Sequence, residues 1–215
     1  MAVELYDEHE QSERVRKWIK EYSATIAMGL ILAFAGIFGF RYWQDHRAEQ
    51  LALGSEYYQV IQGLAEQGDA EAAAAEYETM SAAVGRSAYT GLAGLHVAAS
   101  WVDDGRLGKA ETIYRDILDN RKLKELWPVV NLRLVRVLEA QGEYDEALAL
   151  LDGGAPDGYE AAWLEARGDV FFERGQPDDA RVAWEEALTR RNADGQNVGL
   201  LEIKLDAATS GKGSS

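Results

Sequence analysis

Hydrophobic residues follow two different patterns along this chain. The first is the uncharged run 23–40, which is apolar on every side and is extended by Tyr42 and Trp43. At 1.5 Å per residue, a helix of this length spans roughly 27 Å, close to the thickness of a bilayer's hydrocarbon core. Aromatic rings at its end suit the headgroup level. The pattern therefore predicts a transmembrane helix over residues 23–43.

Two other interpretations of this run are less favoured. A helix buried in a protein core would not need to be apolar on every side. No other segment of the chain is as uniformly apolar as this run. A cleaved signal peptide would not follow a long polar stretch, and the bulky Arg41-Tyr42-Trp43 sequence is a poor cleavage context. We expect an uncleaved anchor.

The cations on the two sides of the run predict its orientation. Four precede it and two follow it: Arg14, Arg16, Lys17 and Lys20, against Arg41 and Arg47. Because cytoplasmic flanks are enriched in Lys and Arg, we expect the N-terminus to lie in the cytoplasm. The protein would then be a single-pass protein of the cell inner membrane. The expected layout is a cytoplasmic tail (1–22), a transmembrane helix (23–43), a periplasmic domain (44–209) and a disordered tail (210–215).

Small residues spaced four apart also lie in the run. Gly29 with Ala33, and Ala35 with Gly39, would let a second membrane helix approach closely. The alternative is that they only reflect ordinary membrane composition. We keep these four as candidate helix contacts.

The second pattern is a repeat. A glycine followed five residues later by an alanine begins at Gly68, Gly105, Gly142 and Gly175, with spacings of 37, 37 and 33 residues. A large apolar residue stands four after each alanine, on the same helix face. These partners are Tyr77, Tyr114, Leu151 and Trp184.

The repeat predicts an all-α fold, a tetratricopeptide-repeat-like α-solenoid of stacked helix hairpins. Each glycine would end a first helix in a left-handed conformation, and each alanine would let the second helix cross closely. A helix over about 46–67, continuous with the span or jointed near Asp45, would begin the first hairpin. A capping helix over 197–208 would close the stack, covering its end with Leu200, Leu201, Ile203 and Leu205.

Composition and motifs exclude several function classes. The chain has 22 Lys+Arg against 37 Asp+Glu, so the clustered cations that nucleic acid requires are not expected. It has no cysteine, which excludes thiolate chemistry, and its three histidines are not at ligand spacing. Gly91 and Gly94 lack the rest of a phosphate loop and are interpreted as turn or packing residues. We expect no catalytic residue, metal or cofactor.

A binding groove is the more credible site, because stacked hairpins form a concave face lined by their first helices. The alternative is that Arg136 and the carboxylates of this face only pair with one another on a solvated surface. By the repeat register, the candidate partner-binding residues are Leu132, Arg136, Glu139, Glu165, Asp169, Phe172 and Glu173.

Several motifs give the chain a resemblance to a known family. They are the basic segment 14–20 before a span ending in Arg41-Tyr42-Trp43, the segment 131–137, Arg167-Gly168-Asp169 and the segment 180–184. With these motifs the chain resembles the YfgM-type ancillary subunits of the bacterial Sec translocon. The resemblance implies association with the SecYEG channel and with the PpiD-like periplasmic chaperone. It implies no enzymatic activity and no small-molecule substrate.

The expected function is therefore that of a non-catalytic scaffold or chaperone cofactor, which binds protein partners through its repeats and assists newly exported proteins. An alternative is an envelope-assembly adaptor that uses the same repeats for a partner outside the Sec system. The acidic segment 4–13 could add a cytoplasmic role by binding a soluble factor.

Overall fold

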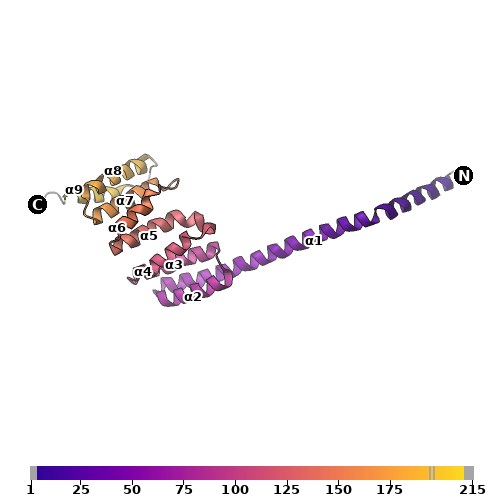
Figure 1. Ribbon diagram of the computed structural model, residues 1–215, viewed down its shortest axis with the longest axis horizontal. Helices are drawn as coiled ribbons and strands as arrows, with labels where there is room; N and C mark the ends of the chain where they lie inside the picture. The colour runs from indigo at the N-terminus through magenta and orange to yellow at the C-terminus, as the bar shows by residue number, and fades with distance from the viewer. Residues whose placement is uncertain (1–3, 194, 196, 211–215) are drawn as a thin grey trace. The chain divides into compact units, whose positions relative to one another are not determined.

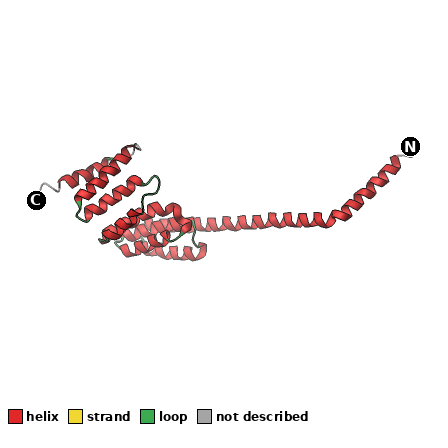
Figure 2. Ribbon diagram, turned by 45° about the horizontal axis from the view of Figure 1, so that its top comes forward, coloured by secondary structure: helices red, strands yellow, loops and turns green. Residues whose placement is uncertain are grey.

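The structure is a computed structural model that describes residues 4–193, 195 and 197–210. It divides into two compact units, residues 1–52 and residues 53–215. Ribbon views show helices and connecting loops throughout the described residues (Figures 1 and 2). The all-helical class expected from the repeat is therefore confirmed.

The first unit consists of the greater part of helix α1, which runs from Glu4 to Glu66. Every side chain from residue 12 to residue 49 is exposed, including the whole apolar run. By length and composition, α1 is the one described helix able to cross a membrane. It passes residue 45 without a break, so of the two forms expected for this region the continuous helix is the one observed.

The second unit is a series of antiparallel hairpins, and its elements follow one another along the stack (Figure 1). The end of α1 lies beside α2 (Ala70–Val84) (Figure 1). Helix α3 (Ala88–Asp103) pairs with α4 (Leu107–Leu118). The short 3₁₀ helix η1 (Arg121–Leu126) leads into α5 (Trp127–Gln141), which pairs with α6 (Tyr144–Asp152). The last hairpin is α7 (Glu160–Glu173) with α8 (Pro177–Ala193), and α9 (Gly199–Ser210) packs on α8.

Each of the four repeat glycines ends a first helix as the sequence predicts. Their φ angles are 77°, 73°, 79° and 84° for Gly68, Gly105, Gly142 and Gly175. At Gly142 the amide donates to Glu139 O at 2.9 Å, and the next amide, of Glu143, donates to Leu138 O at 2.8 Å. Both carbonyls would otherwise lack an intrahelical donor. The same pair of bonds recurs at the other three turns.

The repeat alanines lie where the helices of a hairpin cross. Ala73, Ala110, Ala147 and Ala180 are each fully buried. A methyl side chain is small enough for the two backbones to approach, and the large residue four positions later fills the space beside the crossing.

Gly168 and Trp184 form the closest packing of the last hairpin. A Cβ added to Gly168 would lie within 2.9 Å of three ring atoms of Trp184. The indole Nε1 of Trp184 donates to Asp169 Oδ1 at 3.0 Å, which fixes the ring against α7. Gly168 is therefore required because an indole ring lies against the α7 backbone.

The helix η1, which lies between the second and third hairpins, was not predicted from the sequence. Its Leu123 is buried, and a Cβ on Gly91 would meet Leu126 at 2.8 Å. Gly91 is thus a packing residue, one of the two roles predicted for it. Asn120 caps η1 through a 3.1 Å bond from the Lys122 amide to its side-chain oxygen.

Buried side chains gather in two clusters. The larger one extends from Ile61 in α1 to Val170 in α7. The smaller one joins α8 to α9 through Trp184, Leu201 and Ala208, among others.

The capping helix is present, and its contacts correct one expectation. Leu201 is fully buried and Leu205 packs against the small cluster, but Leu200 and Ile203 are 58% and 66% exposed. The helix turns only one narrow face toward α8, so these two residues do not cover the end of the stack. Of the expected disordered tail 210–215, Ser210 ends α9 and residues 211–215 lie outside the described residues.

Candidate functional site: a groove lined by α3, α5 and α7

The repeat places equivalent residues of three first helices along one groove. Residues of α3 and α5 in equivalent positions are 37 apart, and those of α5 and α7 are 33 apart, as for the turn glycines. Two clefts follow this register, one between α3 and α5 and one between α5 and α7, and they share Arg136 and Ala140. The equivalent sets are Ala99, Arg136 and Asp169; Val102, Glu139 and Phe172; and Asp103, Ala140 and Glu173.

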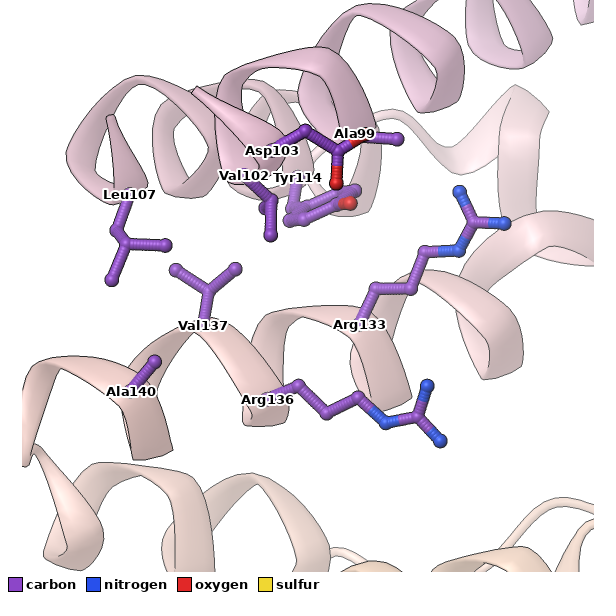
Figure 3. A pocket seen from close by; sticks show the side chains of 9 residues that line it. All are labelled: Ala99, Val102, Asp103, Leu107, Tyr114, Arg133, Arg136, Val137 and Ala140. Atoms are coloured by element: carbon purple, nitrogen blue, oxygen red, sulfur yellow. The ribbon is translucent and has the colours of Figure 1, made fainter. Parts of the chain in front are cut away.

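The α3–α5 cleft has a volume of about 230 Å³ and is largely apolar. Figure 3 shows Val102 of α3 facing Val137 of α5, with Leu107 beside them and the two guanidinium groups of Arg133 and Arg136 on the opposite side. The full lining is Ala99, Val102, Asp103, Leu107, Tyr114, Arg133, Arg136, Val137 and Ala140. This cleft can accept an apolar side chain next to two cations.

The floor of this cleft is the ring of Tyr114, which is buried. Burial raises the pKa of its hydroxyl above the ordinary value, while Arg133 opposes that shift through its charge and a hydrogen bond. Arg133 also donates to the Leu95 carbonyl at 3.3 Å. Tyr114 therefore remains a neutral hydroxyl at the base of the groove.

The α5–α7 cleft is acidic, with a volume of about 360 Å³. Glu139, Asp169 and Glu173 line it together with Arg136. Burial raises the pKa of Glu139 to about 7, and the charges of Asp169 and Glu173 add to the rise. Lys204 and Arg136 oppose it. A bound cation would relieve this repulsion, so the cleft favours lysine or arginine side chains.

Glu165 and Asp169 form ion pairs with residues outside the predicted candidate set. Lys204 of α9 lies 2.7 Å from Glu165 Oε1 and 2.7 Å from Asp169 Oδ1, and Arg191 of α8 also pairs with Glu165. Burial raises the pKa of Asp169, and the bond to Lys204 opposes that rise. These two carboxylates therefore hold α9 against α7.

Unlike Glu165 and Asp169, Arg136 is exposed and forms no ion pair or hydrogen bond within the described part of the chain. Its charge acts on Glu139 only at a distance. The direct pairing of Arg136 with the groove carboxylates, which the sequence left open, is not the arrangement observed.

The two remaining candidate residues line neither cleft. Leu132 is half-buried and packs against the large hydrophobic cluster. Phe172 is exposed on α7, and its ring lies 5.5 Å from that of Trp184, centroid to centroid. The structure thus brings together Arg136, Glu139, Asp169 and Glu173, while Leu132 belongs to the core.

Sequence reasoning missed the α3 side of the groove and Arg133. The signal was available, because subtracting 37 from Arg136, Glu139 and Ala140 gives Ala99, Val102 and Asp103. The repeat motif is clearest in the two later hairpins, and the candidate residues come only from them.

The candidate membrane contacts are all on the surface of α1. Gly29, Ala33, Ala35 and Gly39 are exposed, and a Cβ on either glycine would meet nothing within 4 Å. The face is open to a second helix. Separately, the described residues contain no group of three or more His, Asp or Glu side chains placed to hold a metal ion.

Comparison with known proteins agrees with the fold. The profile of a family described as a tetratricopeptide repeat-like domain matches residues 16–210. The solved structure of a protein described as the MamA RS-1 ArsTM double mutant superposes with a TM-score of 0.52 at 14% identity, covering 76% of this chain and 98% of that one. At this identity the likeness concerns the fold alone.

Two curated relatives match over most of their length. A protein of Escherichia coli (strain K12) named ancillary SecYEG translocon subunit is 31% identical over 187 residues, which is 86% of this chain and 90% of the relative. A protein of the same name from Haemophilus influenzae (strain ATCC 51907 / DSM 11121 / KW20 / Rd) is 30% identical over 187 residues, 87% of this chain and 91% of the relative.

Proposed function

The chain belongs to the family of ancillary SecYEG translocon subunits, and from that premise we propose that it is a non-catalytic, membrane-anchored subunit of the SecYEG translocon. In this proposal its tetratricopeptide-repeat-like domain binds protein partners and assists newly exported proteins. The domain's partners include SecYEG and a PpiD-like periplasmic chaperone.

One observation supports binding in particular, namely the open groove along α3, α5 and α7. Its two clefts share residues and offer apolar, cationic and acidic side chains in succession. A polypeptide can contact all three kinds in order, whereas a small ligand would occupy only one of the two clefts. This favours a scaffold over an enzyme.

The proposed layout follows the charges that flank the apolar run. Residues 1–22 carry the larger number of nearby cations and lie in the cytoplasm, residues 23–43 cross the inner membrane, and residues 44–209 lie in the periplasm. The groove would then lie in the periplasm.

In-cell photocrosslinking tests the proposal. A photoreactive amino acid replaces Phe172, which is exposed beside the groove, or Leu32, which is exposed on α1. We expect Sec channel subunits or a periplasmic chaperone to be captured. Capture of only other envelope proteins would contradict the Sec role and favour the envelope-assembly adaptor.

A charge-reversal pair separates groove contacts from contacts made by the membrane helix. Arg136→Glu combined with Glu173→Lys alters two exposed groove residues without touching the Lys204 ion pairs. We expect capture from position 172 to fall while capture from position 32 persists. Asp169 is unsuitable for this purpose, because it holds both Trp184 and Lys204.

A further inference from the structure

Two arginines line the apolar α3–α5 cleft together with Asp103, and neither forms an ion pair with a carboxylate of the described residues. Arg133 interacts with the Leu95 carbonyl and the Tyr114 hydroxyl, and Arg136 has no partner within the described residues. In contrast, Arg115, Arg167, Arg181 and Arg191 of the same domain each form an ion pair.

Arg121 and Arg190 likewise form no ion pair within the described residues, so what sets Arg133 and Arg136 apart is that both line one cleft. Acidic residues outnumber basic ones by 37 to 22, so carboxylates are plentiful for any arginine that needs one. A guanidinium group has five N–H donors in a planar fork that matches a carboxylate. Two such groups at the edge of an open cleft provide complementary charge for a ligand that brings its own carboxylate.

The size and wall of the cleft restrict the ligand further. A volume of about 230 Å³ is below the roughly 300–1,000 Å³ of ordinary small-molecule sites, and it suits one side chain of a larger ligand. The facing Val102 and Val137 indicate that this side chain is apolar (Figure 3). Past Arg136, the acidic cleft of Glu139, Asp169 and Glu173 would accept a cation.

We propose that the groove recognises a polypeptide segment with a carboxylate next to an apolar side chain and a lysine or arginine further along. The apolar side chain enters the α3–α5 cleft, the carboxylate binds Arg133 and Arg136, and the cation lies against Glu139 and Glu173. This inference rests on the proposed protein-binding function and names the kind of segment bound. The carboxylate belongs to the chain end or to an aspartate or glutamate side chain.

Fluorescence anisotropy on the full chain in nanodiscs tests the inference. The parent probe is a short labelled peptide with a lysine, a flexible spacer and a C-terminal leucine with a free carboxylate. A second probe has an amidated end, a third adds an aspartate before the amidated leucine, and a fourth replaces the lysine with glutamate.

We expect the amidated and the glutamate probes each to bind about tenfold more weakly than the parent. If the third probe regains the affinity, a side-chain carboxylate suffices. If it does not, the chain end is the group recognised. Equal binding of the parent and the amidated probe, or no binding of the parent, would overturn the inference.

Variants assign the effect to the groove. Arg133→Gln with Arg136→Gln should bind the parent and amidated probes equally, and circular dichroism should show that the helices are kept. Arg181→Gln, which changes an arginine on α8 outside the groove, should keep the preference. The inference is also contradicted if the double variant still binds the parent probe more tightly than the amidated probe, or if Arg181→Gln no longer does. Loss of the peptide preference while Sec subunits are still captured in cells would leave the proposed function standing.

Discussion

Single residues decide how closely the last hairpin packs, and Gly168 is the clearest case. We predict that Gly168→Ala lowers the free energy of unfolding by about 1–3 kcal/mol, because overpacking against Trp184 exceeds the gain in helix propensity. Urea denaturation monitored by circular dichroism measures the change. Gly108→Ala in α4 is the matched control, since a Cβ there meets nothing within 4 Å. A stabilised Gly168→Ala would show that Trp184 can move aside.

Because of Glu139, the free energy of unfolding depends on pH. Its pKa is about 7 in the fold against an ordinary 4.5, with Asp169, Glu173, Arg136 and Lys204 around it. As the pH falls, Glu139 therefore takes up a proton in the folded state before it does so in the unfolded state. The free energy of unfolding consequently rises as the pH falls from 7 to 4.5.

From this dependence we predict that Glu139→Gln is more stable than the unaltered chain at pH 8 by on the order of 1 kcal/mol, a value reduced because the side chain is partly solvated. The difference should vanish near pH 4.5. Thermal unfolding across this range measures it, with the exposed Glu143→Gln as the control. A difference that does not change with pH would be inconsistent with the raised pKa.

At the scale of the element, α9 depends on one narrow face. We predict that Leu201→Ala lowers the free energy of unfolding by about 2–5 kcal/mol, while Leu200→Ala, one residue away, changes it by less than about 0.5 kcal/mol. The first residue is fully buried and the second is mostly exposed. Chemical denaturation of both variants checks the contrast, and similar losses would mean that Leu200 also has a packing partner.

Most elements of this fold could be predicted from the sequence because a few residues specify each hairpin. The four turn glycines and buried alanines follow from backbone conformation and close helix crossing, and both are properties of the residue itself. The helix η1 could not be predicted this way. It depends on Leu123 and Leu126 packing against Gly91, a contact with another hairpin that local pattern does not encode.

The groove was predictable only in part, for a related reason. The register identified Arg136, Glu139, Asp169 and Glu173, because equivalent positions of successive hairpins share a face. It could not show that Glu165 and Asp169 pair with Lys204, since that contact is formed by a helix outside the repeat. Nor could it show that Leu132 turns toward the core.

At the scale of the whole domain, the two hydrophobic clusters imply unequal local stability. The large cluster spans several hairpins, whereas α9 is held by the small one and by Lys204. Because each unit of a solenoid contacts only its neighbours, we predict that the amides of α9 exchange hydrogen faster than those of α3 and α5. Native-state hydrogen exchange read by mass spectrometry measures this. Lys204→Met should accelerate exchange in α9 and leave α3 unchanged, and uniform protection would indicate one cooperative unit.

The left-handed turn at Gly142 has a stereochemical consequence. Its φ of 79° is unfavourable for an L-residue and natural for the mirror-image residue, and the position is exposed. A semisynthetic chain with D-alanine at position 142 should therefore keep the hairpin and restrict the unfolded chain, whereas L-alanine should weaken it. The chirality of one methyl group would then decide whether the α5–α6 hairpin gains or loses stability.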